Sequence, residues 1–145
     1  MNIVIRPYAE ADFEPLTEVW FASWESIGLG IPTPQMKVEL REKFPRDIAA
    51  GWSGYVATAG AQIVGFLTLQ GDRLQQLFVA PDLQGRGIGK QLLDFVKAQR
   101  PNGFYLTTPT KGRAALFYER EGLERGAVTT LASFGHEVVR YDWRP

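Results

Sequence analysis

The spacing of apolar positions near the N-terminus predicts one short strand followed by a long helix. Three consecutive apolar residues at positions 3–5 predict the strand. Asp12 is a suitable N-cap for a helix that begins near Phe13. The apolar stripe of this helix, at helical spacing, consists of Phe13, Leu16, Val19, Trp20, Trp24 and Ile27. Gly28 and Gly30 are expected to end it.

A second helix is predicted from Thr33 and Pro34, a cap residue followed by a proline, to the residue before Pro45. From Trp52 onward the apolar spacing shortens to two, which is typical of strands. The predicted strands cover residues 52–58, 62–69, 74–80, 104–108, 127–134 and 136–143. Two further helices begin near residues 88 and 112, and Gly122 is expected to end the second.

The resulting order of elements is β-α-α-β-β-β-α-β-α-β-β. A tight turn at residues 59–61 joins two of the strands as an antiparallel hairpin, whereas one strand–helix–strand crossover favours a parallel pair. We therefore predict the α+β class, with a mixed, mostly antiparallel central sheet between flanking helices in an α/β/α arrangement. The length fits a single domain spanning residues 1–145.

Composition excludes several classes of site. The chain holds 16 basic and 16 acidic residues, so a broad basic surface for nucleic acid is not expected. It contains no cysteine and one histidine, His136, which argues against thiolate chemistry and multi-histidine metal sites; no metal is expected. No run of about 18 apolar residues predicts a membrane span, and the N-terminus does not resemble a secretory signal. We expect a cytoplasmic protein with no membrane partner.

The segment QGRGIGK, residues 84–90, places glycines at alternate positions just after a predicted strand and at the start of a helix. The first N–H groups of a helix lack intrahelical acceptors, and glycines let a phosphate approach the backbone closely. Arg86 and Lys90 add positive charge. This pattern predicts a pyrophosphate-binding loop, although a glycine-rich turn without a ligand remains the alternative. The spacing matches neither a dinucleotide fingerprint nor a Walker A loop.

Two segments carry a resemblance to a known family. VAPDLQGRGIGKQLL, residues 79–93, resembles the coenzyme-binding segment of the GNAT superfamily of N-acetyltransferases, with Gln84, Gly87 and Gly89 at the pattern positions. AALFYEREGL, residues 114–123, resembles a second segment of that family. The resemblance extends over essentially the whole chain, and it implies a GNAT-like acyl-CoA N-acyltransferase fold.

The resemblance implies that acetyl-CoA is the co-substrate. Backbone amides of the loop would hold its pyrophosphate; these belong to Gln84, Gly85, Arg86, Gly87, Ile88, Gly89 and Lys90. The strand edge at Phe78 and Val79 would pair with the pantetheine amides, and an N–H near Val79 would stabilise the oxyanion.

Tyr118 matches the tyrosine that, in many family members, protonates the departing thiolate as the general acid. The alternative is a core aromatic residue on the apolar face of its helix. Lys111 stands where the family often has asparagine, so no binding role is assigned to it.

The general base is unknown. Many family members carry a glutamate on the strand before the loop, but this chain has Gln75 and Gln76 there, and an amide cannot take up a proton at neutral pH. Glu25, Asp72, His136 and ordered water are the candidates for deprotonating the amine. For each acidic residue, a simple surface position is the alternative.

On the acceptor side, the family resemblance directs attention to residues 26–34 and to the turn before the last strand. Trp24, with Trp20 or Tyr55, could form an aromatic wall that accepts an amine substituent. Phe134 and His136 are further candidates for acceptor binding. The alternative for the tryptophans is packing in the core.

We therefore expect acetyl transfer from acetyl-CoA to a primary amine by direct attack in a ternary complex. A cysteine-linked acyl-enzyme is excluded, because the chain has no cysteine. A non-catalytic acyl-CoA binding or sensing module is the alternative, supported by the missing strand glutamate. The acceptor is left open between a small amine and a peptide or protein, and small domains of this kind often form homodimers.

Overall fold

The computed structural model describes residues 2–26, 32–131 and 136–145. Its sheet contains seven strands in the order β1-β2-β3-β4-β5-β7-β6. The strands are β1 (Ile3–Pro7), β2 (Ser53–Ala59), β3 (Gln62–Gln70), β4 (Arg73–Val79), β5 (Phe104–Pro109), β6 (Glu124–Leu131) and β7 (His136–Trp143). Among the described strands, only β4 and β5 pair in parallel, so the predicted mixed, mostly antiparallel sheet is confirmed.

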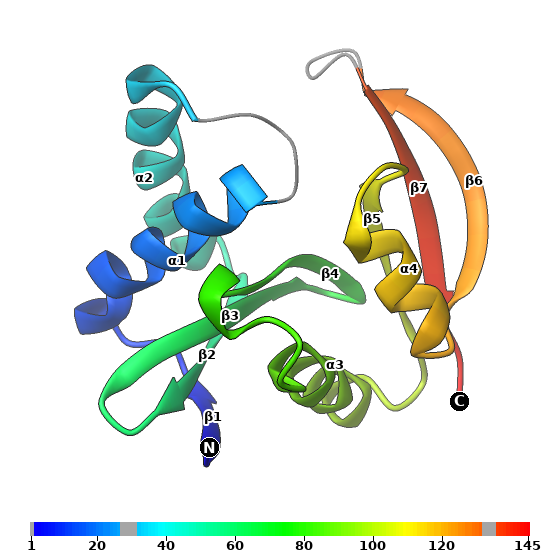
Figure 1. The fold of residues 1–145 in the computed structure, drawn as a ribbon, viewed down its shortest axis with the longest axis horizontal. Helices are drawn as coiled ribbons and strands as arrows, with labels where there is room; N and C mark the ends of the chain where they lie inside the picture. The colour runs from blue at the N-terminus through cyan, green and yellow to red at the C-terminus, as the bar shows by residue number, and fades with distance from the viewer. Residues whose placement is uncertain (1, 27–31, 132–135) are drawn as a thin grey trace.

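Helices cover both faces of the sheet (Figure 1). The helices are η1 (Glu10–Asp12), α1 (Phe13–Ser26), α2 (Pro34–Ala49), η2 (Pro81–Leu83), α3 (Ile88–Gln99) and α4 (Arg113–Arg120). One core cluster joins α1 and α2 to side chains of β2 and β3 such as Val56 and Phe66. The other joins α3 and α4 to the opposite face of the sheet. The predicted fold class is therefore confirmed.

The expected end of the second helix before Pro45 is wrong, because α2 continues to Ala49 with Pro45 inside it. Proline within a helix removes one backbone hydrogen bond. Here Phe44 is buried and Ile48, one turn later on the same face, packs against the same cluster. Burial of these two side chains offsets the missing hydrogen bond. The sequence pattern alone did not predict that burial.

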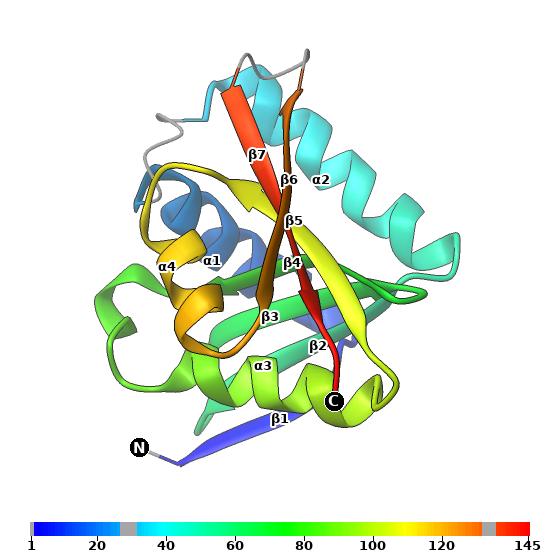
Figure 2. The same ribbon diagram turned by 90° about the vertical axis from the view of Figure 1, so that its right-hand side faces the viewer.

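The predicted end of α4 at Gly122 is confirmed. Gly122 has a φ of 91°, and the N–H of Leu123 donates to the carbonyl of Tyr118 at 3.0 Å. This left-handed closure, typical of helix ends, turns the chain directly into β6. β6 begins at Glu124, three residues before the predicted start, and lies at the edge of the sheet with residues 124–130 exposed (Figure 2).

Candidate active site

The sheet opens between its two parallel strands. β4 and β5 share a single register position, Arg73 with Tyr105, and then diverge as Figure 1 shows. β5 continues along β7 through six paired positions, from Phe104 to Pro109. The divergence leaves one edge of β4 without a neighbouring strand, beginning just after Arg73. This splay is where backbone groups become available to a ligand.

Hydrogen-bond alternation decides which residues of β4 face the splay. The N–H of Ala80 donates to the carbonyl of Val64 on β3 at 2.9 Å. In an antiparallel pair, every second residue directs both its N–H and its C=O to the same neighbour. The polar backbone groups of Phe78 therefore also point to β3, where its register partner is Phe66. Leu77 and Val79 direct theirs into the splay. The prediction that the backbone of Phe78 lies at this edge is wrong, and Leu77 takes its place beside Val79.

The carbonyl of Val79 already accepts hydrogen bonds from the protein. The hydroxyl of the buried Ser23 on α1 donates to it at 2.9 Å, and Nε2 of Gln84 donates at 3.4 Å. The N–H of Val79 thus remains the group at this position that can serve a ligand. Ser23 was not predicted from the sequence, although a small polar residue three positions after Trp20 on an apolar helix was a usable signal.

The glycine loop forms an open cradle at the start of α3. Gly85 and Gly87 have φ angles of 81° and 82°, and a Cβ on either would meet no atom within 4 Å. Their backbone conformation, not crowding, therefore requires glycine. The first hydrogen bond of the helix runs from the N–H of Gln91 to the carbonyl of Gly87 at 3.1 Å. The N–H groups of Ile88, Gly89 and Lys90 precede it and have no acceptor within the helix.

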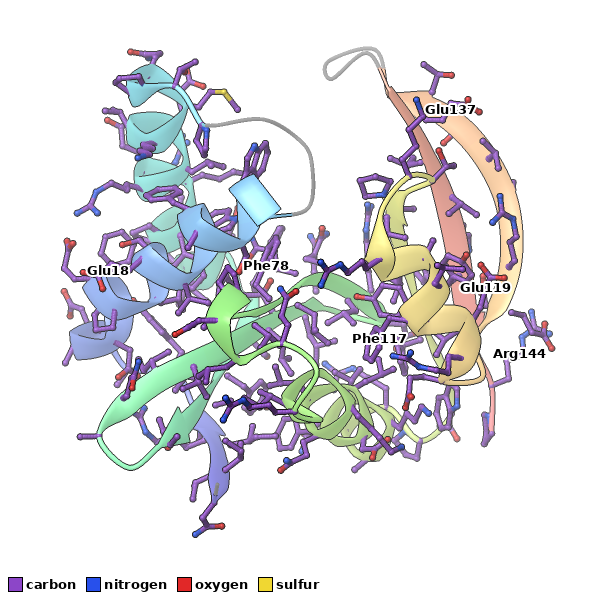
Figure 3. All side chains as sticks on the ribbon, in the orientation of Figure 1. Glu18, Phe78, Phe117, Glu119, Glu137 and Arg144 are labelled. Atoms are coloured by element: carbon purple, nitrogen blue, oxygen red, sulfur yellow. The ribbon has the colours of Figure 1, made fainter. Side chains whose placement is uncertain are left out.

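The cradle lies beside the splayed edge of β4. A Cβ built on Gly89 would lie 3.8 Å from Cγ2 of Val79 and 3.5 Å from Cζ of Phe117 on α4. Figure 3 shows Phe117 on the side of α4 that faces α3. The structure therefore brings the glycine loop, the splayed edge of β4 at Val79 and the Phe117 side of α4 together. Together they offer donors to an anion and, a few residues along β4, donors and acceptors to an amide chain.

The side chains of the loop contribute differently from its backbone. Ile88 is buried in the core, so only its N–H faces the cradle. Arg86 is exposed. Lys90 is turned toward two carboxylates, with its Nζ 3.2 Å from Glu121 and 3.5 Å from Asp94. The hydrogen bond to Glu121, together with Asp94, raises the pKa of the Lys90 ammonium above its ordinary value. Lys90 remains charged beside the cradle, but it does not point freely into it.

Tyr118 is a buried residue of α4. Its ring lies 5.2 Å from that of Phe117 and 6.0 Å from that of Tyr141 on β7, measured between centroids. Burial raises the pKa of its phenol well above the ordinary value. The neutral, proton-bearing form is therefore the one present at physiological pH. Lys111, before the start of α4, is exposed.

A polar contact holds α4 against β7. The hydroxyl of Tyr141 donates to Oε2 of Glu119 at 2.6 Å, and Nη1 of Arg125 lies 3.7 Å from the same oxygen. Because the ring of Tyr141 is fully buried against Tyr118, this contact fixes the helix that carries Tyr118. The contact between Tyr141 and Glu119 was not predicted from the sequence, because it depends on how β7 is positioned under α4.

Of the residues named as candidate bases, Asp72 is the one whose side chain the structure describes, and it lies away from Val79. Gln76 accepts a hydrogen bond from Thr68 at 2.8 Å, and Gln75 donates to Gln70 at 2.7 Å. Asp72 is in the β3–β4 turn, at the opposite end of β4 from Val79. The side chains of Glu25 and His136 lie outside the described residues; His136 opens β7, where its register partner is Leu131.

The two residues predicted to join Trp24 in an aromatic wall, Trp20 and Tyr55, both pack in the interior. Trp20 is a core residue at 3% exposure, with ring contacts to Phe66 and Phe78, as its alternative reading predicted. Tyr55 packs against Phe95 of α3 at 4.7 Å, on the sheet face opposite α1. The prediction that Tyr55 joins Trp24 in one wall is therefore wrong. Trp24 is half-buried near the end of α1, and Phe134 lies outside the described residues.

Within the described ranges, no three His, Cys, Asp or Glu side chains converge in a group that could hold a metal ion. None of the helices in the same ranges is both long enough and apolar enough to cross a membrane.

These features define a class: a mixed sheet splayed between two parallel strands, with a glycine cradle at the adjoining helix N-terminus. The family model described as "Acetyltransferase (GNAT) domain" matches residues 51–125, which include β2 through α4. The chain belongs to the GNAT family of acetyltransferases and is an N-acetyltransferase.

A curated relative and two solved structures agree with this assignment. The chain is 33% identical to the peptidyl-lysine N-acetyltransferase YjaB of Salmonella typhimurium over 86% of this chain and 85% of the relative. The apo form of YjaB from Escherichia coli has a TM-score of 0.74 at 22% identity, covering 98% of this chain and 96% of that one. PaiA N-acetyltransferase from Thermoplasma acidophilum, solved in complex with coenzyme A, has a TM-score of 0.73 at 21% identity, covering 99% and 100%.

Proposed function

We propose that the protein transfers the acetyl group of acetyl-CoA to the side-chain amine of a lysine in a peptide, by direct attack in a ternary complex. The observation that carries the proposal is the adjacency of the loop amides of residues 88–90 to the outward-facing N–H of Val79. A pyrophosphate at the helix start and an amide chain along β4 would use both at once. The coenzyme A complex of PaiA and the peptidyl-lysine activity in the name of YjaB support this choice of substrates.

In the proposed reaction, the neutral amine nitrogen attacks the thioester carbonyl carbon and forms the C–N bond. The carbonyl oxygen becomes an oxyanion, to which the N–H of Val79 donates a hydrogen bond. The C–S bond then breaks, and the sulfur receives the proton of the Tyr118 hydroxyl. The new amide nitrogen loses one proton to water, and Tyr118 regains its proton from solvent.

Tyr118 suits the role of general acid because it stays protonated. Burial raises the pKa of the Tyr118 phenol. By the same physics, a thiolate leaving group would be disfavoured in desolvated surroundings. The difference between the two pKa values, rather than either one alone, sets the ease of proton transfer.

The first experiment is thermal unfolding with excess acetyl-CoA, with ADP as the control ligand. Saturation to about one hundred times the dissociation constant adds about 2.7 kcal/mol of stability. The second is release of the coenzyme thiol with a lysine peptide, followed with a thiol-reactive dye. Because the chain contains no cysteine, every thiol detected comes from the coenzyme.

A thermal shift larger with acetyl-CoA than with ADP, followed by peptide-dependent thiol release, supports the proposal. A shift without release across peptides and small amines favours the non-catalytic acyl-CoA binding module instead. A feature of the sequence supports that alternative, since β4 carries Gln75 and Gln76 where a carboxylate base is common. The absence of any shift contradicts both readings.

A further inference from the structure

Arg73, the first residue of β4, carries a half-buried guanidinium that has no acidic partner among the residues described. Its Nη2 donates to the hydroxyl of Thr107 on β5 at 3.2 Å, while its Nε is buried and has no acceptor among the residues described. A guanidinium has five N–H donors, and a buried polar group without a partner is costly. A partner that the described residues do not supply is therefore indicated at this position.

Several arginines of the described chain have no carboxylate partner, but Arg73 is the one that also has a buried N–H without an acceptor. Arg6 forms an ion pair with Asp12, and Arg41 forms one with Glu14. Arg125 lies near Glu119. Arg73 takes part in no ion pair with a described residue, although it is less exposed to water than a surface arginine.

A second arginine lies against the same aromatic ring as Arg73. The guanidinium carbon of Arg140 on β7 lies 4.0 Å from the ring centroid of Tyr105, and that of Arg73 lies 5.9 Å from the same centroid. Arg140 binds Asp142 through two hydrogen bonds of 2.8 and 3.0 Å. In this cluster, Asp142, which is also close enough to Arg144 for its charge to act on it, pairs with Arg140, whereas Arg73 pairs with no described carboxylate.

The cluster lies at the apex of the splay, on the face that α3 and α4 do not cover. Phe104 and Leu106 on β5, and Val139 and Tyr141 on β7, point into the core beneath α3 and α4. Their neighbours Tyr105 and Arg140 must therefore point to the opposite face. Arg73 pairs with Tyr105 at the one position where β4 and β5 meet. Leu77, at the open edge, is four residues further along β4, about 10–13 Å away.

We propose that Arg73, assisted by Arg140, binds the carboxylate of an aspartate or glutamate about three residues from the lysine that the enzyme acetylates. This inference rests on the proposed function. The fork of N–H groups on a guanidinium matches the two oxygens of a carboxylate. The N–H of Val79, to which we assign the oxyanion, is about 17–20 Å from Arg73 along β4. Three residues of extended peptide span about 10 Å, and the lysine side chain adds about 6 Å, so together they approximately cover this distance. Tyr105 holds both guanidinium groups over one ring and so limits their movement.

The test compares two peptides that differ in one residue. Each carries one lysine and a blocked N-terminus, with either glutamate or glutamine three residues from the lysine. For the wild-type enzyme, we expect kcat/KM for the glutamate peptide to exceed that for the glutamine peptide about 10-fold, as for one charge-assisted hydrogen bond. In Arg73→Gln the ratio should fall to about one. Arg46→Gln, an exposed arginine of α2, is the matched control and should keep the wild-type ratio.

Asp142→Asn provides a test of opposite sign. It removes the carboxylate that occupies Arg140 while leaving both guanidinium groups in place. The preference for the glutamate peptide should therefore rise above that of the wild type, a gain that a merely structural role of the cluster would not produce. This variant also decides the matter if thermal unfolding shows that Arg73→Gln does not fold.

Direct binding separates failure of this inference from failure of the proposed function. The anisotropy of the two peptides, fluorescently labelled, measures their affinity for the protein without turnover. Equal acetylation of the two peptides by the wild type would overturn the carboxylate site while leaving lysine acetylation intact. A binding preference that Arg73→Gln abolishes, without acetylation of any peptide, would support the site and contradict the proposed reaction. Equal binding without acetylation contradicts both.

Discussion

The hydroxyl of Ser23 donates a hydrogen bond to the carbonyl of Val79 at 2.9 Å, joining α1 to the strand edge that lines the splay. Because β5 has diverged at this point, that carbonyl has no strand partner among the described residues. The bond thus replaces a missing ladder contact and fixes the residue whose N–H we assign to the oxyanion. α1 therefore supports the proposed reaction without touching the substrate.

Ser23→Ala should destabilise the protein by about 1–2 kcal/mol, because a buried acceptor loses its closest donor. For a domain of this size, that lowers the melting temperature by about 2–4 °C per kcal/mol. Acetyl-CoA affinity, measured by calorimetry, should fall as well. Thr17→Val is the control, since Thr17 is equally buried on α1 but donates to Glu14 within the helix. It should lose stability without losing affinity; equal affinity losses in the two variants would contradict the role of Ser23.

Substitution of Gly87, which has a left-handed backbone conformation, should affect both the stability of the protein and its affinity for acetyl-CoA. Gly87→Glu should cost about 1–2 kcal/mol of stability from its positive φ. It should also weaken acetyl-CoA binding about 100-fold or more, because a carboxylate would occupy the anion cradle. Isothermal titration and thermal unfolding measure the two effects.

Gly60→Glu is the matched control for this substitution. Gly60 is in the β2–β3 turn with a φ of 61°, and like Gly87 it has no atom within 4 Å of a Cβ position. It should show a comparable loss of stability with unchanged coenzyme affinity. If Gly87→Glu binds acetyl-CoA as tightly as Gly60→Glu does, the cradle is assigned to the wrong loop.

The order of elements was predictable because each signal is local. Period-two runs marked the strands, and glycines such as Gly122 marked helix ends by their own backbone preference. The continuation of α2 through Pro45 was not predictable, since it depends on Ile48 reaching a cluster built by α1 and β3. By contrast, the loop at residues 84–90 was predictable from the sequence, because consecutive residues form it.

The parts of the site that depend on pairing between distant segments were missed. The direction of the Phe78 backbone follows from the register with Phe66, and no feature near Phe78 in the sequence encodes it. Tyr55 was placed with Trp24 because both are aromatic, but strand alternation puts Tyr55 on the face covered by α3. A role for Arg73 was not predicted for the same reason. That its buried Nε has no acceptor becomes apparent only once the sheet is assembled.

Tyr118→Phe should lower kcat about 100-fold while leaving the dissociation constant of acetyl-CoA unchanged, since only the proton donor is removed. Steady-state kinetics with a lysine peptide, together with calorimetry, measure the two constants. Phe117→Leu, which alters the neighbouring ring but no proton donor, serves as the control. An unchanged kcat in Tyr118→Phe would remove Tyr118 from the mechanism.

The raised pKa of Tyr118 also predicts how stability depends on pH. An unfolded phenol ionises near its ordinary pKa of about 10, whereas burial keeps the folded one protonated at that pH. Above pH 10 the native state therefore holds more protons than the unfolded state, and stability falls as pH rises, by up to about 1.4 kcal/mol per pH unit for this group. Urea unfolding between pH 9 and 11 should show a shallower fall in Tyr118→Phe; identical slopes would contradict the assigned burial.

Gly65 on β3 tests whether the position of the β4 edge matters for the coenzyme. A Cβ at Gly65 would lie 2.9 Å from the carbonyl oxygen of Phe78 and 3.1 Å from Cδ1 of Leu92. Because the carbonyl belongs to the backbone, Gly65→Ala must move β4 itself, at a cost of about 1–3 kcal/mol. Acetyl-CoA affinity should fall, since Val79 is next to Phe78. Gly54→Ala, crowded by side-chain atoms of Tyr8 and Ile48, should lose stability alone; retention of full affinity in Gly65→Ala would show that the coenzyme does not use this edge.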